Sequence, residues 1–366
     1  MTGFGGPPAH IALLRRLVVD RYGWMDDREF EDANAACGLL PGPASTQLAI
    51  LCAYRIAGTP GAIIGGLGFI APAVLLVLAL SPVFLSHAPP TWVRGAGAGA
   101  GAAVAAVALH AARGLLGPSL KRARADRARA VAWLGYLLAG TAAAALLGPY
   151  LVLVLLACGI LEVAREHSVN GPLGLHWGPL GALAPAVSTG SIAALAWTAF
   201  KVGALSFGGG FVIIPLMQGD AVHVYHWRTN AQILNAVALG QVTPGPVVAT
   251  IAAVGYAAHG LWGGLAAAVF AFTPSFTFIL LGGGRFERVR EHPRARAFLD
   301  GAGPAAIGAI LGACVTLTEG LHHTWQLALL AAAVIALLGL RRGVVETLLG
   351  AGVIGVIAAL AGAPLP

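Results

Sequence analysis

Charged side chains are scarce in this sequence. Asp, Glu, Lys and Arg make up 10% of its 366 residues, whereas a soluble globular domain averages about 25%. So few charges cannot cover a water-facing surface. The 58% of residues that are hydrophobic occur in blocks near the roughly 20 residues that a bilayer-spanning helix needs. The scarcity of charge therefore excludes a soluble protein and predicts an all-α, polytopic membrane protein.

Motifs for energy coupling and catalysis are also lacking. The sequence has no Walker A motif and only two lysines, Lys121 and Lys201, which argues against ATP hydrolysis by this chain. The four cysteines form no CxxC pair and are expected to be small buried hydrophobes. Neither metal-ligand spacing nor a nucleophile–base pair is visible. We therefore predict a protein that is not an enzyme and that carries no cofactor or metal.

Two copies of one unit fill the chain. Three motifs recur after 203 residues: Phe4-Gly5-Gly6 as Phe207-Gly208-Gly209, Tyr22 with Trp24 as Tyr225 with Trp227, and Pro41-Gly42-Pro43 as Pro244-Gly245-Pro246. Three matches in one register rarely arise by chance, so we predict a duplication. The predicted parts are a first repeat at 1–164, a linker at 165–187 and a second repeat at 188–366. The second repeat starts with an apolar segment, 188–206, that the first lacks, and we expect the first repeat to be missing its initial helix.

The basic loops predict that the repeats are inverted. Loop 118–130 follows the helix that contains Gly95, whereas loop 285–296 precedes the equivalent helix that contains Gly301. Positive loops stay in the cytoplasm, so equivalent helices must cross in opposite directions, in about 12–13 membrane segments. This placement also explains the net charge of +7 without a nucleic-acid partner. Inverted repeats are common in secondary transporters, whose substrate sites lie at the repeat interface.

The Pro-Gly-Pro motifs are the strongest candidates for that site. Apolar runs predict spans at 34–57 and 237–258, each interrupted by one motif. Proline removes helical hydrogen bonds, and the freed groups are tolerated in a bilayer only inside protein or beside water. A helix that begins there exposes N–H groups that suit an anion, and the Gly-rich motifs can bring bare backbone close to a ligand. The alternative is that both motifs are kinks for close packing.

Predictions also follow for a lysine, a glycine-rich stretch and the histidines. Lys201 lies within an apolar span, and an intramembrane charge is expected to be functional, here by attracting an anion. The alternating glycines and alanines at 95–101 predict a helix-packing face. Lone histidines such as His10 are expected to be hydrogen-bonded rather than functional. The buried acids visible in the sequence, Glu162 and Glu319, lie away from the Gly-Pro motifs.

The motifs resemble those of the chromate transporter (CHR) family. The resemblance is carried by Phe4 to Pro7 and Leu39 to Leu48, and in the second repeat by Lys201 to Gly209 and Gly240 to Pro246. It covers nearly the whole chain, in the family's long, two-domain form. It implies efflux of chromate, with sulfate as its analogue, through a multi-pass protein of the bacterial inner membrane that confers chromate resistance.

A tetrahedral dianion suits amide N–H groups, hydroxyls and one or two cations. The candidate substrate-binding residues are Phe4, Gly5, Gly6, Pro7, Pro41, Gly42, Pro43, Ser45, Thr46, Gln47, Lys201, Ser206, Gly208, Gly209, Gln241, Thr243, Pro244, Gly245 and Pro246. Chromate and the surrounding lipid are the expected partners, and homo-oligomerisation stays open. Two alternatives also stay open: a transporter of another oxyanion such as sulfate, and an intramembrane enzyme that acts on a phosphorylated lipid.

Overall fold

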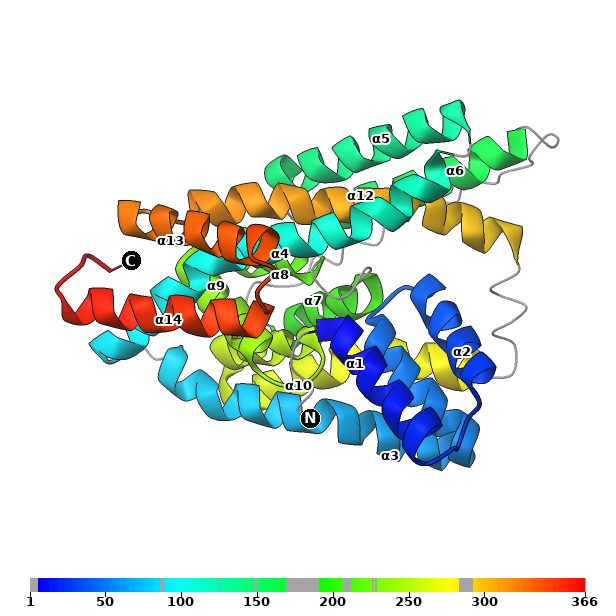
Figure 1. Ribbon diagram of the computed structural model, residues 1–366, viewed down its shortest axis with the longest axis horizontal. Coiled ribbons are helices and arrows are strands. Elements are labelled where there is room, and N and C mark those ends of the chain that lie inside the picture. The colour runs from blue at the N-terminus through cyan, green and yellow to red at the C-terminus, as the bar shows by residue number, and fades with distance from the viewer. Residues whose placement is uncertain are drawn as a thin grey trace.

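The fold is a bundle of helices that lie roughly along one axis (Figure 1). The structure is a computed structural model that describes residues 6–85, 89–124, 126–147, 150–168, 191–206, 212–225, 227, 229–282 and 292–365. All regular secondary structure in these ranges is helical. Five helices are long and apolar enough to cross a bilayer, and four shorter ones are apolar: Ile192–Leu205, Gln232–Val242, Thr324–Gly339 and Val344–Leu360. The predicted all-α, polytopic membrane fold is confirmed.

The two halves of the chain contain similar series of elements. The first half has α1 (Gly6–Arg15) with a π-helical turn (Arg16–Arg21), α2 (Asp27–Leu39), α3 (Ala44–Phe84), α4 (Thr91–Ala123), α5 (Arg127–Ala142) with a π-helical turn (Ala143–Leu147), and α6 (Leu151–Ser168). The second half has α7 (Ile192–Leu205), α8 (Ile213–Gln218) with a π-helical turn (Gly219–Val224), α9 (Asn230–Val242), a 3-10 turn (Val247–Ala249), α10 (Thr250–Gly282), α12 (Pro293–Glu319), α13 (Thr324–Val334) with a π-helical turn (Ile335–Gly339), and α14 (Val344–Leu360).

Backbone irregularities recur at matching positions in the two halves. Each of the first π-helical turns is followed by a stacked aromatic pair, with ring centroids 4.5 Å apart for Tyr22 and Trp24 and 4.8 Å apart for Tyr225 and Trp227. Both long helices that follow the Pro-Gly-Pro motifs are broken once by a glycine with positive φ, at Gly58 (+63°) in α3 and at Gly260 (+64°) in α10.

The chain folds back at Pro-Gly-Pro instead of crossing straight through. The Arg55 guanidinium, late in the first arm of α3, donates to the carbonyl oxygen of Glu29 at the start of α2, at 3.1 Å. Residues 44–56 therefore return alongside α2, and the predicted span 34–57 is a hairpin whose turn is Pro41-Gly42-Pro43. The reason is that two prolines remove helical hydrogen bonds and Gly42 adopts a φ of +117°. We call residues 41–43 the first tip and residues 244–246 the second tip.

A second reversal follows each tip. In α3, Gly61 and Gly65 pack on Ala53 across the break at Gly58, with no room for a Cβ on either glycine. In α10, Gly255 packs on Gly263 in the same way across the break at Gly260. Each helix is thus two antiparallel arms, a short one that carries a tip and a long one that can cross the bilayer.

The halves pack against each other reciprocally. Helix α4 packs on α13 and α14, and its counterpart α12 packs on α5 and α6. The long arms of α3 and α10 are antiparallel, since Gly66 contacts Phe276 while Leu78 contacts Gly264. Helices α4 and α12 also run in opposite directions (Figure 1). The basic loop predicted at 285–296 lies mostly outside the described residues.

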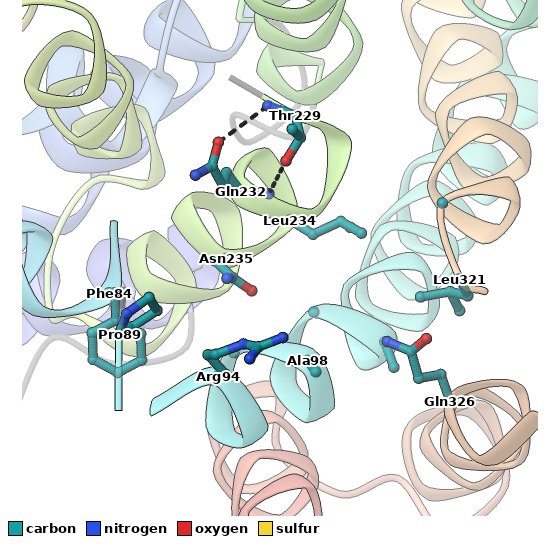
Figure 2. A pocket seen from close by; sticks show the side chains of 14 residues that line it. Phe84, Pro89, Arg94, Ala98, Thr229, Gln232, Leu234, Asn235, Leu321 and Gln326 are labelled. Carbon is teal, nitrogen blue, oxygen red and sulfur yellow. Dashed lines mark hydrogen bonds between the residues drawn. The ribbon is translucent and has the colours of Figure 1, made fainter. Parts of the chain in front are cut away.

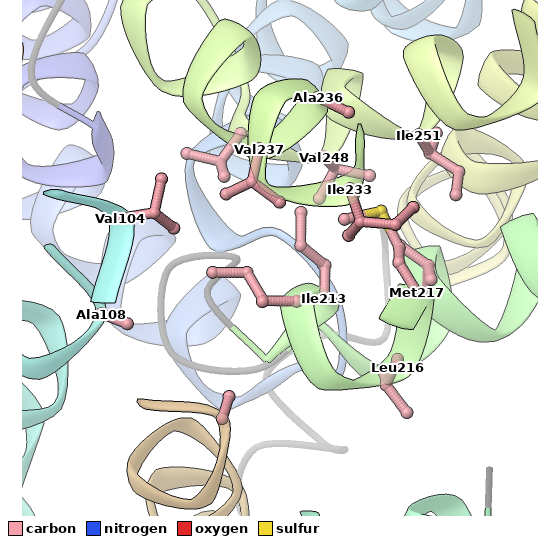
Figure 3. Packing of buried hydrophobic residues seen from close by; sticks show 14 of the residues in the cluster. Val104, Ala108, Ile213, Leu216, Met217, Ile233, Ala236, Val237, Val248 and Ile251 are labelled. Carbon is pink, nitrogen blue, oxygen red and sulfur yellow. The ribbon is translucent and has the colours of Figure 1, made fainter. Parts of the chain in front are cut away.

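Small side chains bring the helices together. Gly95 and Gly99 of α4 contact Gly355 of α14, while Gly97 of the same helix contacts Asn235 of α9, which confirms the packing face predicted at 95–101. Further along α4, apolar side chains of α8, α9 and the start of α10 fill the core with no charged residue among those drawn (Figure 3). The second tip, between α9 and α10, is therefore connected to helices that pack closely in the core.

Candidate functional site

Both tips lie in the interior of the bundle. Gly42, Pro43 and Pro246 are buried. Within the first hairpin the Gln47 amide donates from Nε2 to the carbonyl oxygen of Pro41 at 2.7 Å, which ties the tip to the helix that it starts. Pro43, the N-cap of α3, makes no capping hydrogen bond with its side chain. The N–H groups of Thr46 and Gln47 donate to the Pro43 carbonyl oxygen at 2.9 and 3.0 Å, so the N–H groups of Ala44 and Ser45 are the ones that a side-chain cap would have served.

Each tip contacts the opposite half of the chain. A Cβ on Gly42 would lie 3.3 Å from the carbonyl oxygen of Gly203 in α7, and a Cβ on Gly245 would lie 2.6 Å from the Cβ of Ala73 in α3. Gly245 has a φ of +122°, a conformation that side chains disfavour. Glycine is therefore needed at both tips for conformation and for space, and neither tip points into lipid.

Polar atoms without partners cluster in sequence around the tips. Among the described residues, the buried atoms without a hydrogen-bond partner include Thr46 Oγ1, Gln47 Oε1, Gln241 Nε2 and Ser275 Oγ. Such an atom costs about 1–3 kcal/mol and calls for an explanation. Thr46 and Gln47 follow the first tip, and Gln241 precedes the second by three residues. A ligand that accepts hydrogen bonds would satisfy Thr46 Oγ1 and Gln241 Nε2, whereas Gln47 Oε1 can be satisfied only by a donor.

His10 links the two tips through a short series of contacts. Its ring is buried, with Nδ1 3.4 Å from Ser45 Oγ, and its edge meets the Phe69 ring at a centroid distance of 5.3 Å. The Phe69 carbonyl oxygen would in turn lie 3.7 Å from a Cβ on Gly245. The sequence predicts only a hydrogen-bonded role for His10. In the structure it contacts Ser45, next to the first tip, and Phe69, which adjoins the second tip.

Lys201 is paired with an acid that the sequence analysis missed. Its Nζ lies 2.6 Å from Asp220 Oδ2, and the two side chains are 13% and 3% exposed. The Thr198 hydroxyl donates to the same oxygen at 2.7 Å, and the Trp197 ring centroid is 5.8 Å from Nζ. The missed signal was an aspartate inside an apolar segment. The predicted cation is thus neutralised in this state by a buried carboxylate.

The other predicted residues fall into three groups: two that bond to local backbone, two at the start of α1, and four outside the described residues. The Ser206 hydroxyl donates to the Gly203 carbonyl at 3.3 Å and the Thr243 hydroxyl to the Gly240 carbonyl at 3.1 Å, so both stabilise local backbone. Gly6 and Pro7 begin α1. The remaining four, Phe4, Gly5, Gly208 and Gly209, lie outside the described residues.

A separate polar cavity was not predicted. It has a volume of about 290 Å³ and lies where the start of α4 meets α9 and α13. Figure 2 shows its polar side chains, from Arg94, Thr229, Gln232, Asn235 and Gln326. The sequence does not single out Arg94, because it borders a loop and resembles an ordinary interfacial anchor. In the described part of the chain, no three His, Cys, Asp or Glu side chains are grouped to hold a metal.

Known proteins resemble the chain over most of its length. A chromate transporter family model matches residues 1–163 and 193–361. The chromate transport protein of Cupriavidus metallidurans is 33% identical, with 97% of this chain and 90% of the relative covered. Similar proteins are the probable chromate transport protein of Synechococcus elongatus, at 29% identity with 87% and 82% covered, and the chromate transport protein of Pseudomonas aeruginosa, at 31% with 87% and 78% covered.

No solved structure matches the chain. The relatives are named as transport proteins, not as enzymes, which removes the alternative of an intramembrane lipid enzyme. The apolar helices and the bacterial relatives together make it a multi-pass bacterial membrane protein. The chain belongs to the chromate transporter family.

Proposed function

We propose that this protein is a secondary transporter that exports chromate from the bacterial cytoplasm and so confers chromate resistance. The observation that carries the proposal is the pair of interior tips, each packed on the opposite half and flanked by buried polar atoms without partners. Family membership adds the substrate class, because three curated relatives are named for chromate transport.

The proposed architecture is a pair of inverted repeats, at 1–164 and 188–366, joined by a linker at 165–187. The antiparallel long arms of α3 and α10 and the opposite directions of α4 and α12 favour it. The basic side chains after α4 favour a cytoplasmic location for that loop. The two tips would then enter the membrane from opposite faces and meet near its centre, as half-helices do in other inverted-repeat transporters.

The groups around the tips suit a tetrahedral dianion. Thr46 Oγ1 and Gln241 Nε2 are donors, and the start of α3 adds backbone N–H groups and the positive end of a helix dipole. Lys201 would contribute charge when its bond to Asp220 is exchanged for a bond to the substrate. The proposed substrate-binding residues therefore remain those at the tips, with Asp220 added as the partner that holds Lys201.

Export by this route does not require ATP. Two negative charges that leave a cell with an interior potential of about −100 mV gain roughly 4.6 kcal/mol. A transporter that binds the bare dianion can therefore be driven by the membrane potential, or by an exchanged ion.

The direct test is uptake of radiolabelled chromate by everted membrane vesicles. We expect accumulation that depends on the potential, competition by sulfate, and loss of uptake in Gly42→Leu. Gly58→Ala is the matched control, because Gly58 also has a positive φ but has no neighbour within 4 Å of an added Cβ. Uptake in right-side-out vesicles only would contradict export. Sulfate uptake without chromate uptake would assign a different oxyanion.

A further inference from the structure

The cavity between α4, α9 and α13 has the chemistry of an anion site. We propose that it is an oxyanion-binding vestibule, separate from the tips, through which the transported anion reaches or leaves the site between them. The binding follows from the cavity itself, whereas its role as a vestibule rests on the proposed function. Arg94, Asn235 and Gln326 extend from three different helices toward the same space (Figure 2).

The described lining of the cavity carries positive charge and no acid. Arg94 supplies the charge, and Asp and Glu are absent from the lining residues. A guanidinium presents five N–H donors in a fixed plane, which matches the oxygens of a tetrahedral anion. Arg94 has an interaction elsewhere in the chain, but its side chain is exposed, so an anion in water can approach the donors that this interaction leaves.

The amide side chains of the lining are oriented to donate. Gln232 Oε1 accepts from the Thr229 backbone N–H at 3.2 Å, and Gln326 Oε1 accepts from the His323 backbone N–H at 3.3 Å. Since each carbonyl end is held by its helix cap, the Nε2 end is the one that can donate to a ligand. The caps thus favour an anion over a cation in this cavity.

A glycine makes room for the third amide. A Cβ on Gly97 would lie 2.7 Å from Asn235 Oδ1 and 2.9 Å from Asn235 Nδ2. Any side chain at this position would displace Asn235 from the floor of the cavity. The bare backbone of α4 and the amide of Asn235 therefore form one surface.

Helix α9 connects this cavity to the second tip. Asn235 lines the cavity, and Gln241, whose Nε2 has no partner, lies six residues further along the same helix. Six residues of α-helix span roughly 9 Å. An anion held by Arg94 is therefore about two helical turns from the groups that we assign to the central site.

The equivalent position in the second half has the opposite charge. The spacing of 206 residues between Gly95 and Gly301 places Asp300 where the first half has Arg94. Asp300 lines a smaller cavity of about 40 Å³ together with Glu162 and Arg129. The two pockets thus differ in charge and in size, and the larger one, whose described lining has an arginine and no acid, suits an oxyanion better.

The test is the number of oxyanions bound per chain. Purified full-length protein in maltoside detergent is dialysed to equilibrium with radiolabelled sulfate, and in parallel with radiolabelled chromate. Wild type should bind two ions per chain, and Arg94→Gln should remove one of them or weaken it by on the order of tenfold, since a charge-assisted bond is lost. Arg113→Gln, an exposed arginine of the same helix outside the cavity, should bind as wild type does.

A second pair of variants leaves Arg94 in place. Gly97→Ala should weaken the same site by crowding Asn235, whereas Gly114→Ala, in a helical position where no atom lies within 4 Å of an added Cβ, should not. Unchanged stoichiometry and affinity in both Arg94→Gln and Gly97→Ala would overturn the proposal. Arg94→Lys, which keeps the charge, should retain most of the binding and shows that a loss does not reflect misfolding.

Two further outcomes distinguish the vestibule from the site between the tips and from a lipid-binding site. A wild type that binds one ion, which Arg94→Gln abolishes, would support the vestibule and refute the site between the tips. The phosphate of a lipid headgroup has the same chemistry as a free oxyanion. If binding at Arg94 disappears in phosphatidylglycerol nanodiscs but not in detergent, the cavity belongs to lipid and the vestibule is refuted.

Discussion

The two tips have the same backbone conformation but are followed by different side chains. Gly42 and Gly245 have φ values of +117° and +122°, and both sit between prolines. After the first tip come Ala44, Ser45, Thr46 and Gln47, and after the second come Val247, Val248, Ala249 and Thr250; all of them but Ala44 are buried. Conformation was kept in both halves, whereas polar chemistry is concentrated after the first tip. The difference indicates that the backbone conformation is required in both halves, whereas the polar side chains that follow it are not.

The largest effect should come from filling either tip. Gly42→Leu forces a side chain into a strained conformation and against Gln47 and the Gly203 carbonyl, and Gly245→Leu meets Ala73. We expect chromate uptake by everted vesicles to be abolished in both. If Gly245→Leu transported normally while Gly42→Leu did not, the second tip would be a packing kink, and the claim that both tips serve transport would fail.

The next effect concerns the charged pair of Lys201 and Asp220 in the second half. Asp220→Asn leaves Lys201 buried without a countercharge, and breaking a buried pair typically costs about 3–5 kcal/mol. The double variant Lys201→Met with Asp220→Leu should recover most of that stability but not chromate transport. Thermal unfolding in detergent and vesicle uptake measure the two effects. A double variant that transports as well as wild type would reduce the pair to a structural role.

A smaller effect should separate function from stability. Thr46→Val removes a hydroxyl that has no partner, so stability should stay level or rise by up to about 1–3 kcal/mol, while uptake falls by on the order of tenfold. Thr250→Val, in the second half, removes a hydroxyl that donates to the Val247 carbonyl at 2.7 Å and should lose about 1 kcal/mol of stability. If Thr46→Val lowered stability without affecting uptake, the hydroxyl would have a partner other than substrate.

The smallest effect should come from the aromatic pairs at the outer ends of the hairpins. Trp24→Ala and Trp227→Ala each remove a stacked ring, and such a pair contributes about 0.5–1.5 kcal/mol. Because Trp24 is 55% exposed whereas Trp227 packs against the core, we expect a modest loss of thermal stability in Trp24→Ala, a larger one in Trp227→Ala, and little change in uptake in either. Equal losses would show that the core contacts of Trp227 add nothing to its stacking.

Sequence reasoning located the tips because broken backbone leaves a sequence signal. Proline and glycine indicate where a helix must stop, and their recurrence after 203 residues predicts a duplication. The same signal did not reveal the direction of the chain after the break. A kink and a reversal use the same residues, and contacts across the break, of Arg55 with Glu29 and of Gly240 with Thr250, distinguish them.

Pairing between distant side chains left no such signal. Lys201 looked like an isolated intramembrane cation because Asp220 lies nineteen residues away and beyond a turn. An inspection of every acid in an apolar segment would have found it, since a buried charge is expected to have a partner. The vestibule could not be predicted, because α4, α9 and α13 meet there only in three dimensions.

The most direct test of the account is to locate bound chromate in the full-length protein by electron cryo-microscopy. The account predicts a density peak between the two tips, within hydrogen-bond distance of Thr46 Oγ1 and Gln241 Nε2, with or without a second peak at Arg94. A map of a saturated, transport-competent sample that shows chromate at Arg94 or elsewhere but none between the tips would contradict it.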